Sequence, residues 1–209
     1  MAKKGTFIVF EGGEGSGKDT LINLLKEKLS GRTDVVYTRA PGGTLLGDHI
    51  RKLLLSHESA DLHPRTELLL FLATHTELVE KVIAPALQAG KTVISNRFTP
   101  STIAYQIYGR EQQEHLMLAR EALRLVTRGI VPDICIYLDV PPELGAQRTK
   151  KRPESLTRFD EEELAFHERV REGYKKHLGE FARKTVTIDT SGATEDAWKK
   201  TEEALQSFI

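Results

Sequence analysis

Disulfides, membrane-spanning segments and a surplus of one charge are all missing from this 209-residue sequence. It contains one cysteine, Cys135, so no intramolecular disulfide is possible and a reducing compartment is expected. No apolar run approaches the ~18 residues of a transmembrane helix. The first residues lead into a predicted strand without a signal-peptide core. We therefore expect a cytoplasmic enzyme with no membrane partner.

Balanced charge leaves no global preference for a polyanionic partner. Thirty lysines and arginines match thirty aspartates and glutamates, so we expect no nucleic-acid partner, and local clusters must bind any anion. Zinc-type spacing of histidine with cysteine is also missing. The histidines to which we assign no metal are His49, His57, His63, His115, His167 and His177.

Short apolar runs alternate with helical patterns along the chain. Runs typical of strands occupy 7–10, 34–39, 92–95, 134–138 and 185–188. Helical patterns occupy 21–29, 46–54, 64–85, 111–127, the segment from Pro142, 164–181 and 198–208. This alternation predicts an α/β fold with a parallel sheet and right-handed crossovers. Because no repeat, low-complexity tract or linker interrupts it, we expect a single domain over residues 1–209.

The stretch from Glu11 to Thr20 carries the strongest functional signal. It reads EGGEGSGKDT and joins the first predicted strand to the first predicted helix, a place that does not suit a flexible linker. Its glycines let successive backbone N–H groups point at one anion, and the helix adds its positive end. The spacing predicts an ATP-binding P-loop made of Gly12, Gly13, Glu14, Gly15, Ser16, Gly17, Lys18, Asp19 and Thr20.

Asp19 departs from the usual P-loop, in which a serine or threonine follows the lysine and ligates Mg²⁺. That ligand is either displaced to Thr20 or replaced by the Asp19 carboxylate, which can itself bind Mg²⁺. We expect Mg²⁺ as the cofactor, with Asp19 as its candidate ligand.

Charged residues also follow the other predicted strands, at Arg39, Asn96–Arg97, Asp139 and Asp189. Ligands of open α/β sheets bind beyond the carboxyl ends of the strands, so these arginines converge on the edge that holds the P-loop. A phosphotransferase needs such an edge because two anionic substrates must approach each other there. Arginine suits bidentate contact with phosphate oxygens.

Several motifs resemble those of bacterial thymidylate kinases, in the same order. They lie at 10–18, Thr38–Thr44, Glu67–Phe71, Asn96–Gln106, Pro132–Val140 and Arg158–Tyr174. The resemblance implies a three-layer P-loop NTP hydrolase fold, with a five-stranded parallel sheet flanked by helices and a short basic lid. It also implies transfer of the ATP γ-phosphoryl group to dTMP, giving dTDP and ADP for dTTP biosynthesis.

The same resemblance assigns roles to single residues. It implies that Lys18 follows the migrating group, that Glu14 faces the sugar and that Phe71 stacks on the base. An aromatic face together with an amide suits a flat ring that forms hydrogen bonds. Arg39 and Arg97 would hold the 5′-phosphate. The implied substrate-binding residues are Glu14, Arg39, Phe71, His75, Arg97, Ser101, Tyr105 and Gln106.

The family's mobile lid falls on residues 148–158. Its cations are Arg148, Lys150, Lys151, Arg152 and Arg158. Since the P-loop has no arginine at its centre, the chain resembles the subgroup in which a lid arginine stabilises the transition state. The implied catalytic residues are Lys18, Arg97, Arg148 and Arg152. Taken alone, the basic run also fits a solvated helix end, or a nucleic-acid surface that lacks interleaved aromatics.

Three more residues depart from the family pattern. Ala40 and Asn96 stand where the family has acids, and we hypothesise that Asp19 compensates for Asn96 in binding Mg²⁺. His75 stands where an arginine reads the pyrimidine carbonyl. A neutral imidazole can still donate one hydrogen bond, although an ordinary polar residue on a helix is the alternative.

Members of the family are commonly homodimers packed through helices. The apolar stripe from Leu68 to Ile83 is our candidate for such an interface. Two alternative functions remain open at the level of sequence. One is a kinase for a different nucleoside monophosphate, and the other is a nucleotide-binding regulator without turnover, which the altered Mg²⁺-side residues suggest.

Overall fold

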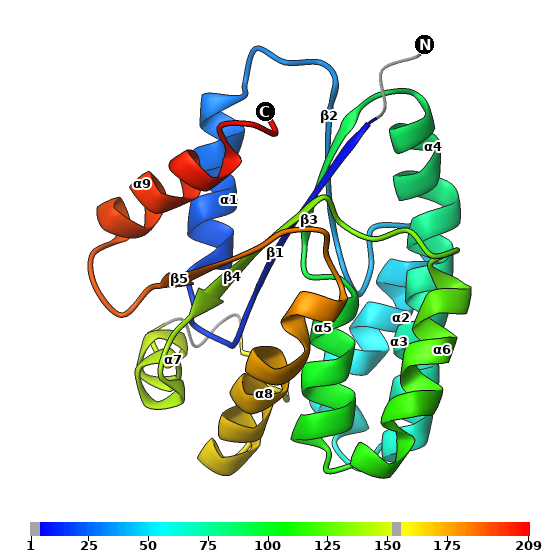
Figure 1. The fold of residues 1–209 in the computed structure, drawn as a ribbon. Coiled ribbons are helices and arrows are strands. Elements are labelled where there is room, and N and C mark those ends of the chain that lie inside the picture. Colours follow the sequence, from blue (N-terminus) through cyan, green and yellow to red (C-terminus); the bar gives the residue numbers. More distant parts are fainter. Residues whose placement is uncertain (1–4, 152–155) are drawn as a thin grey trace.

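A computed structural model describes residues 5–151 and 156–209 as a parallel sheet with helices on both faces (Figure 1). Its strands are β1 (Thr6–Gly12), β2 (Val35–Arg39), β3 (Thr92–Asn96), β4 (Ile134–Asp139) and β5 (Thr185–Asp189). They form one five-stranded sheet in the order β2-β3-β1-β4-β5, and all neighbouring pairs are parallel. The predicted α/β fold and the predicted strands are confirmed.

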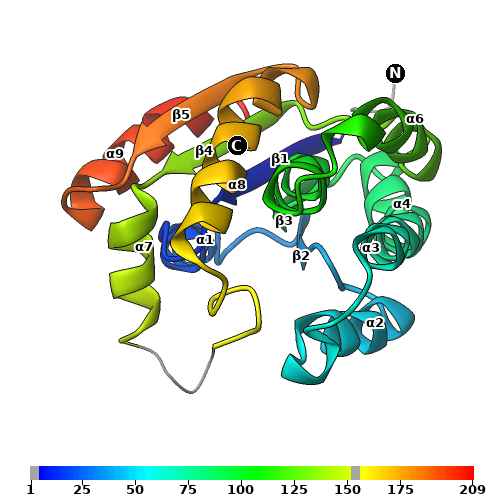
Figure 2. The ribbon, with the colours of Figure 1, turned by 90° about the horizontal axis from the view of Figure 1, so that it is seen from below.

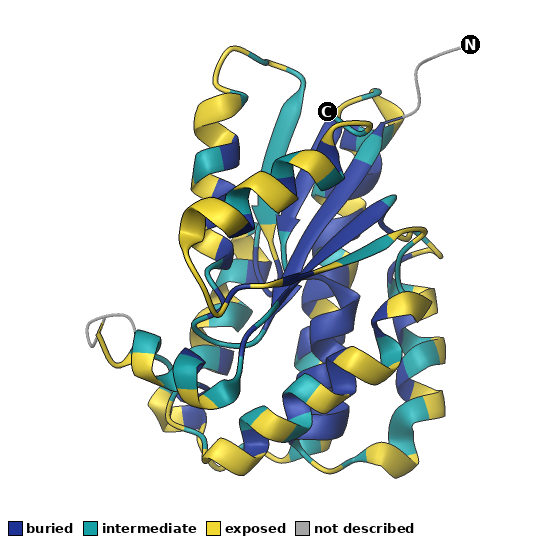
Figure 3. Cartoon of the chain, turned by 60° about the vertical axis from the view of Figure 1, so that its left-hand side comes forward, coloured by how far each residue is buried: buried dark blue, intermediate teal, exposed yellow. Residues whose placement is uncertain are grey.

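The two faces of the sheet build separate cores, and side chains of β1 alternate between them as a strand requires. Ile8 and Phe10 pack under α1 (Lys18–Lys28) and α9 (Thr194–Leu205). Phe7 and Val9 pack in the larger core on the other face. The helices that cover this second face include α3 (Pro64–Leu78), α4 (Ala84–Gln88), α5 (Thr99–Thr102) and α8 (Leu164–His177). Figure 3 shows the strands buried between these layers.

The remaining helices complete the second face and the rim of the sheet. They are α2 (Leu45–Leu55), α6 (Leu116–Val126), α7 (Pro142–Thr149), the 3-10 helices His57–Ser59, Gln113–His115 and Leu178–Glu180, and the π-helices Val79–Ile83 and Ile103–Gly109. Seen toward the carboxyl ends of the strands, α2 stands on one side and α7 on the other (Figure 2). Within the described residues, no helix is both long enough and apolar enough to cross a membrane.

The long helix begins at Pro64, as predicted, and continues through the π-turn Val79–Ile83 into α4. Proline fits its first turn, where the missing N–H has no partner to lose. Most of the stripe from Leu68 to Ile83, our candidate for a dimer interface, faces the chain's own interior, whereas Leu69 is 65% exposed. Leu68, Phe71, Leu78, Val79 and Ile83 are buried within the chain's own cores. Periodicity identifies an apolar face without showing what covers it.

The sequence pattern missed the helical segment Thr99–Gly109, made of α5 and the following π-helix. Every residue in it is buried, so the segment has no polar side and no helical period. It packs closely on α8, where a Cβ at Gly173 would lie 2.8 Å from the Cβ of Tyr108. This helix carries Ser101, Tyr105 and Gln106 to the site described next.

Candidate active site

One cavity of about 320 Å³ lies at the carboxyl edge of the sheet. It brings together most of the residues that the sequence singled out: Glu14, Gly15, Ser16, Gly17, Lys18, Asp19, Thr20, Arg39, Phe71, His75, Arg97, Ser101, Tyr105 and Gln106. Gly12 and Gly13 belong to the same loop but do not line this cavity. The strand-end residue Asp139 lies apart from it and pairs instead with Arg171 at 2.7 Å and Lys175 at 3.2 Å.

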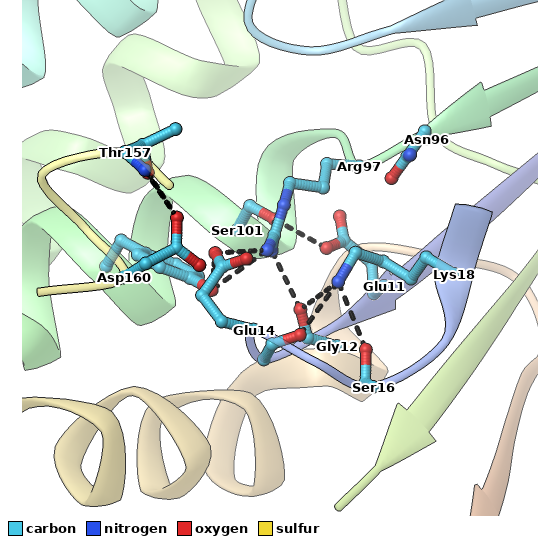
Figure 4. A network of polar contacts seen from close by, with 12 residues as sticks. Glu11, Gly12, Glu14, Ser16, Lys18, Asn96, Arg97, Ser101, Thr157 and Asp160 are labelled. Carbon is cyan, nitrogen blue, oxygen red and sulfur yellow. Dashed lines mark hydrogen bonds and ion pairs between the residues drawn. The ribbon is translucent and has the colours of Figure 1, made fainter. Parts of the chain in front are cut away.

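The P-loop has the backbone that a phosphate cradle needs. Gly15 and Gly17 adopt φ angles of 67° and 88°, which favour glycine, and Gly17 is the N-cap residue of α1. Lys18 folds back over the loop (Figure 4), where its Nζ donates to the carbonyl oxygens of Gly12 at 2.9 Å and Gly13 at 2.8 Å. Burial, reinforced by Arg97, lowers the pKa of Lys18 to about 8. A phosphate bound on the loop would raise the pKa of Lys18 again, because its negative charge would offset the effects of burial and of Arg97.

Arg97 is the most constrained cation of the site. Its φ of 68° is a left-handed conformation that side chains rarely adopt. Its Nη2 donates to Glu14 Oε1 at 2.7 Å and to the Tyr105 hydroxyl at 2.9 Å. Its Nη1 donates to the Gly12 carbonyl at 2.8 Å, to Ser101 and to Tyr174 (Figure 4). The guanidinium is therefore fixed in position.

Glu14 stays ionised beside this cation. Burial would raise the pKa of Glu14, but Arg97 and then Lys18 outweigh burial and lower it to about 2. Its Oε1 also accepts from the Tyr105 hydroxyl at 2.8 Å. The carboxylate thus acts as a fixed acceptor at the rim of the P-loop.

Glu11 supports this arrangement and was not predicted as a site residue. It is fully buried, and burial raises its pKa above the ordinary value. Its Oε1 accepts from the Phe98 amide at 2.7 Å, and its Oε2 accepts from Ser101 at 2.6 Å and Tyr174 at 2.9 Å. The available signal was an acid near the end of an otherwise apolar strand.

A third arginine, Arg51, was also missed. It lies on α2, lines the cavity and donates to the Pro41 carbonyl at 2.8 Å. Burial, together with Arg39 and then Arg97, lowers the pKa of Arg51 to about 10. Three guanidinium groups that disfavour one another in one cavity make a site for a multiply charged anion. In the sequence, Arg51 lies within a helix recognised only by its apolar stripe, and nothing in that pattern marks it as a site residue.

Aromatic and amide side chains line the far end of the cavity, beyond the arginines. Phe71, His75, Tyr105 and Gln106 all contribute to its wall. His75 is 1% exposed, and burial lowers its pKa to about 4, so the imidazole is neutral. His75 is thus a buried residue of the cavity wall, and its part in reading the base stays a prediction.

The lid is described only in part, and Arg152 lies outside the described residues. Arg148 contacts the P-loop edge, donating to the Thr190 carbonyl at 2.8 Å and the Gly15 carbonyl at 3.4 Å, but it does not line the cavity. Its catalytic assignment stays a prediction. The expectation that Arg158 is a lid cation is wrong, because this arginine is buried and pairs with Glu67 at 2.5 Å.

The end of the predicted lid and the residues just after it supply wall residues that the sequence did not single out for the site. Leu156, Thr157, Phe159 and Asp160 line the cavity. Asp160 holds the segment in shape by accepting from the Thr157 amide at 2.8 Å and the Thr157 hydroxyl at 2.7 Å (Figure 4). Phe159 lies edge-on to Phe71 with ring centroids 6.3 Å apart. Two aromatic rings thus enclose this part of the cavity.

Two oxygen-bearing side chains meet beside the P-loop lysine. The amide of Asn96 donates to Asp19 Oδ1 at 2.7 Å, and Asn96 Oδ1 is buried without a partner. The residues present thus fit a cation that binds mainly through phosphate oxygens and takes one or two protein oxygens, as Mg²⁺ does. Among residues 5–151 and 156–209, no cluster of three or more acids, histidines or cysteines could hold a metal by itself.

Comparison with known proteins matches nearly the whole chain. A family model described as thymidylate kinase matches residues 10–201. A thymidylate kinase of Staphylococcus epidermidis is 42% identical over 207 residues, covering 98% of this chain and 97% of the relative. One of Desulfovibrio desulfuricans is 41% identical over 210 residues, with 97% and 96% covered. The crystal structure of thymidylate kinase from Ehrlichia chaffeensis superposes with a TM-score of 0.77 at 33% identity, covering 97% of this chain and 99% of the other.

Proposed function

The chain belongs to the thymidylate kinase family, and from that premise we propose how its residues transfer the γ-phosphoryl group of ATP to dTMP. It is an ATP-dependent nucleoside monophosphate kinase, and its products are dTDP and ADP. The observation that carries the assignment of residues is the single cavity that joins the P-loop, a cluster of arginines and an aromatic pocket. That cavity can hold two anionic groups and one flat ring together.

On the donor side, the backbone of the P-loop and the start of α1 would cradle the ATP phosphates. Lys18 Nζ already lies over the loop carbonyls of Gly12 and Gly13. It would exchange these carbonyls for phosphate oxygens and follow the migrating group. Because Lys18 is buried, its charge acts in a site from which water is largely excluded, where electrostatic stabilisation is strongest.

On the acceptor side, Arg39, Arg51 and Arg97 would hold the 5′-phosphate of dTMP. Glu14 would face the sugar, and Phe71 would stack on the base. The transfer is direct and in line, so it needs no covalent nucleophile, and positioning with electrostatics supplies the catalysis. The lid, about 148–158, is proposed to add Arg148 and Arg152 to the transition state within one kinase domain.

Mg²⁺ would be held by the ATP phosphates together with Asp19 and the unpartnered oxygen of Asn96. When bound, the ion neutralises charge on the phosphates. The hydrogen bond from the Asn96 amide to Asp19 holds the Asp19 carboxylate beside Asn96, where the family has an acid. This contact supports the hypothesis that Asp19 compensates for Asn96 in binding Mg²⁺.

Replacing Asp19 by alanine should raise the Mg²⁺ concentration needed for half-maximal activity by roughly 10-fold, because an oxygen next to the metal is lost. The measurement is a Mg²⁺ titration of turnover at saturating ATP and dTMP. Glu27→Gln, an exposed acid of the same helix, is the matched control and should leave the titration unchanged. An unchanged Mg²⁺ dependence in Asp19→Ala would show that Asp19 has no part in metal binding.

A steady-state panel tests the function itself. ADP release is measured with dTMP, dUMP, dCMP, dGMP and dAMP, with and without Mg²⁺, and saturable turnover should be greatest with dTMP. Greater turnover with another monophosphate would show that this nucleotide, and not dTMP, is the acceptor. ATP binding without turnover on any of them would identify a nucleotide-binding regulator instead.

A homodimer and a cytoplasmic location complete the proposal. Exposed leucines support the dimer, and one of them, Leu69, belongs to the stripe Leu68–Ile83 predicted from the sequence. They lie on the neighbouring helices α2, α3 and α6 and are Leu45, Leu46, Leu53, Leu69, Leu118 and Leu125. The single, fully buried Cys135 suits a reducing compartment.

A further inference from the structure

Two buried polar atoms at the base end of the cavity have no hydrogen-bond partner in the described structure. They are His75 Nδ1 and Gln106 Oε1. Both side chains are 1% exposed, and both line the cavity. Buried polar groups are seldom left unpaired in native proteins because the loss of hydration is not compensated. These two atoms therefore point to a ligand with complementary groups.

Thr102 decides which nitrogen of His75 carries the proton. Its hydroxyl lies 2.9 Å from His75 Nε2 and makes no other hydrogen bond within the described ranges. The neighbouring threonines differ, since Thr74 donates to the Phe71 carbonyl and Thr76 donates to the Leu72 carbonyl. With no carbonyl to receive its proton, the Thr102 hydroxyl donates to Nε2. A neutral imidazole that accepts at Nε2 carries its hydrogen on Nδ1 and is a donor there.

Glu67 fixes the orientation of the Gln106 amide, because a carboxylate can only accept a hydrogen bond from it. This carboxylate is fully buried and pairs with Arg110 at 3.2 Å and Arg158 at 2.5 Å. A carboxylate held by two guanidinium groups is an acceptor only. The Gln106 amide must therefore turn its Nε2 toward Glu67, at 3.1 Å. Its Oε1 is then left as an acceptor on the cavity side.

We propose that Thr102 is a positioning residue that fixes the His75 proton on Nδ1, so that the base pocket offers a donor beside the Gln106 acceptor. This pair complements a pyrimidine with a carbonyl at position 4 and an N–H at position 3. Cytosine presents the reverse, an amine and an unprotonated nitrogen. The proposal rests on the proposed function, and it assigns the discrimination between 4-oxo and 4-amino pyrimidines to a hydroxyl that need not touch the nucleotide.

Thr102→Val tests the proposal with kinetics on dTMP and dCMP. Valine keeps the shape but removes the hydroxyl, so His75 can adopt either tautomer. The ratio of kcat/KM for dTMP to that for dCMP should fall on the order of 10-fold. Thr102→Ser should restore the ratio. Thr74→Val removes a buried hydroxyl that bonds only to its own helix, next to His75 in sequence but outside the cavity lining, and it should leave the ratio unchanged. An unchanged ratio in folded Thr102→Val would overturn the proposal.

A second measurement does not depend on turnover. ¹⁵N NMR of the wild-type chain labelled in histidine should find His75 as the Nδ1–H tautomer, identified by loss of its signals in His75→Phe. The Nε2–H tautomer would overturn the proposal. Failure of the proposed kinase function and failure of the Thr102 proposal give different results. Absence of turnover with every monophosphate refutes the proposed kinase, whereas the tautomer is read from the protein alone.

Discussion

Lys18→Met should lower kcat for phosphoryl transfer by roughly 10²–10³-fold, the effect of removing one preorganised charge from a developing anion. Methionine matches the length of the lysine stem and fills the same buried space, so the change isolates the charge. ATP should still bind, since the backbone amides of the P-loop and the start of α1 are untouched. The measurement is single-turnover kinetics at saturating ATP and dTMP, which reports the chemical step.

Lys26→Met provides the matched control for Lys18. Lys26 lies on the same helix, is exposed and contacts the ring of Tyr37 at 5.3 Å. Its loss should change kcat by less than about twofold, as expected for an exposed charge remote from the reaction. A rate in Lys18→Met within a few-fold of the wild-type rate would mean that the lysine holds the loop carbonyls and takes no part in the transfer.

Glu67→Gln should lower the free energy of unfolding by about 3–5 kcal/mol, because it leaves the buried Arg158 without a counter-charge and Arg110 with Glu162 alone. The Glu67 side chain is 0% exposed and that of Arg158 is 4% exposed, so solvent cannot screen the loss. Arg110 loses the same partner. Urea unfolding at neutral pH, followed by circular dichroism, measures the change.

Glu80→Gln is the comparison for Glu67 on the same long helical run. Glu80 pairs with Arg128 at 3.3 Å, but the two side chains are 48% and 55% exposed. Exposed pairs of this kind contribute about 0–1 kcal/mol. Equal losses of stability in the two variants would show that Glu67 is as well solvated as Glu80, which would contradict the burial on which its role depends.

The strands could be predicted because each is a short apolar run bounded by polar or glycine-rich segments. The P-loop could be predicted because its glycine spacing follows from the geometry of phosphate binding. Helix Thr99–Gly109 could not, since a helix buried on every side shows no period. The same limit applies to the proposed dimer interface, because an apolar stripe gives the same pattern whether it faces another chain or the chain's own core.

Site residues were predictable where a motif names them and not where the fold alone brings them in. Arg39, Phe71 and Arg97 belong to motifs and do line the cavity. Glu11 and Arg51 come from an apolar strand and from a helix flank, and only tertiary contacts bring them to the site. His75 was located by its place in the long helix. Its neutral state follows from burial, which a single sequence does not reveal.

Arg97 and Arg39 are held in opposite ways. Five acceptors from different parts of the fold immobilise Arg97, so folding, rather than the arriving nucleotide, supplies the order of that group. Arg39 is exposed and bonds only to Asp48 among the described side chains, so substrate binding must order it. If both arginines hold the acceptor phosphate as proposed, the cost of ordering Arg39 weakens substrate binding and raises KM, whereas Arg97 needs no ordering when the nucleotide arrives. Substrate affinity can therefore change through Arg39 while Arg97 stays in place.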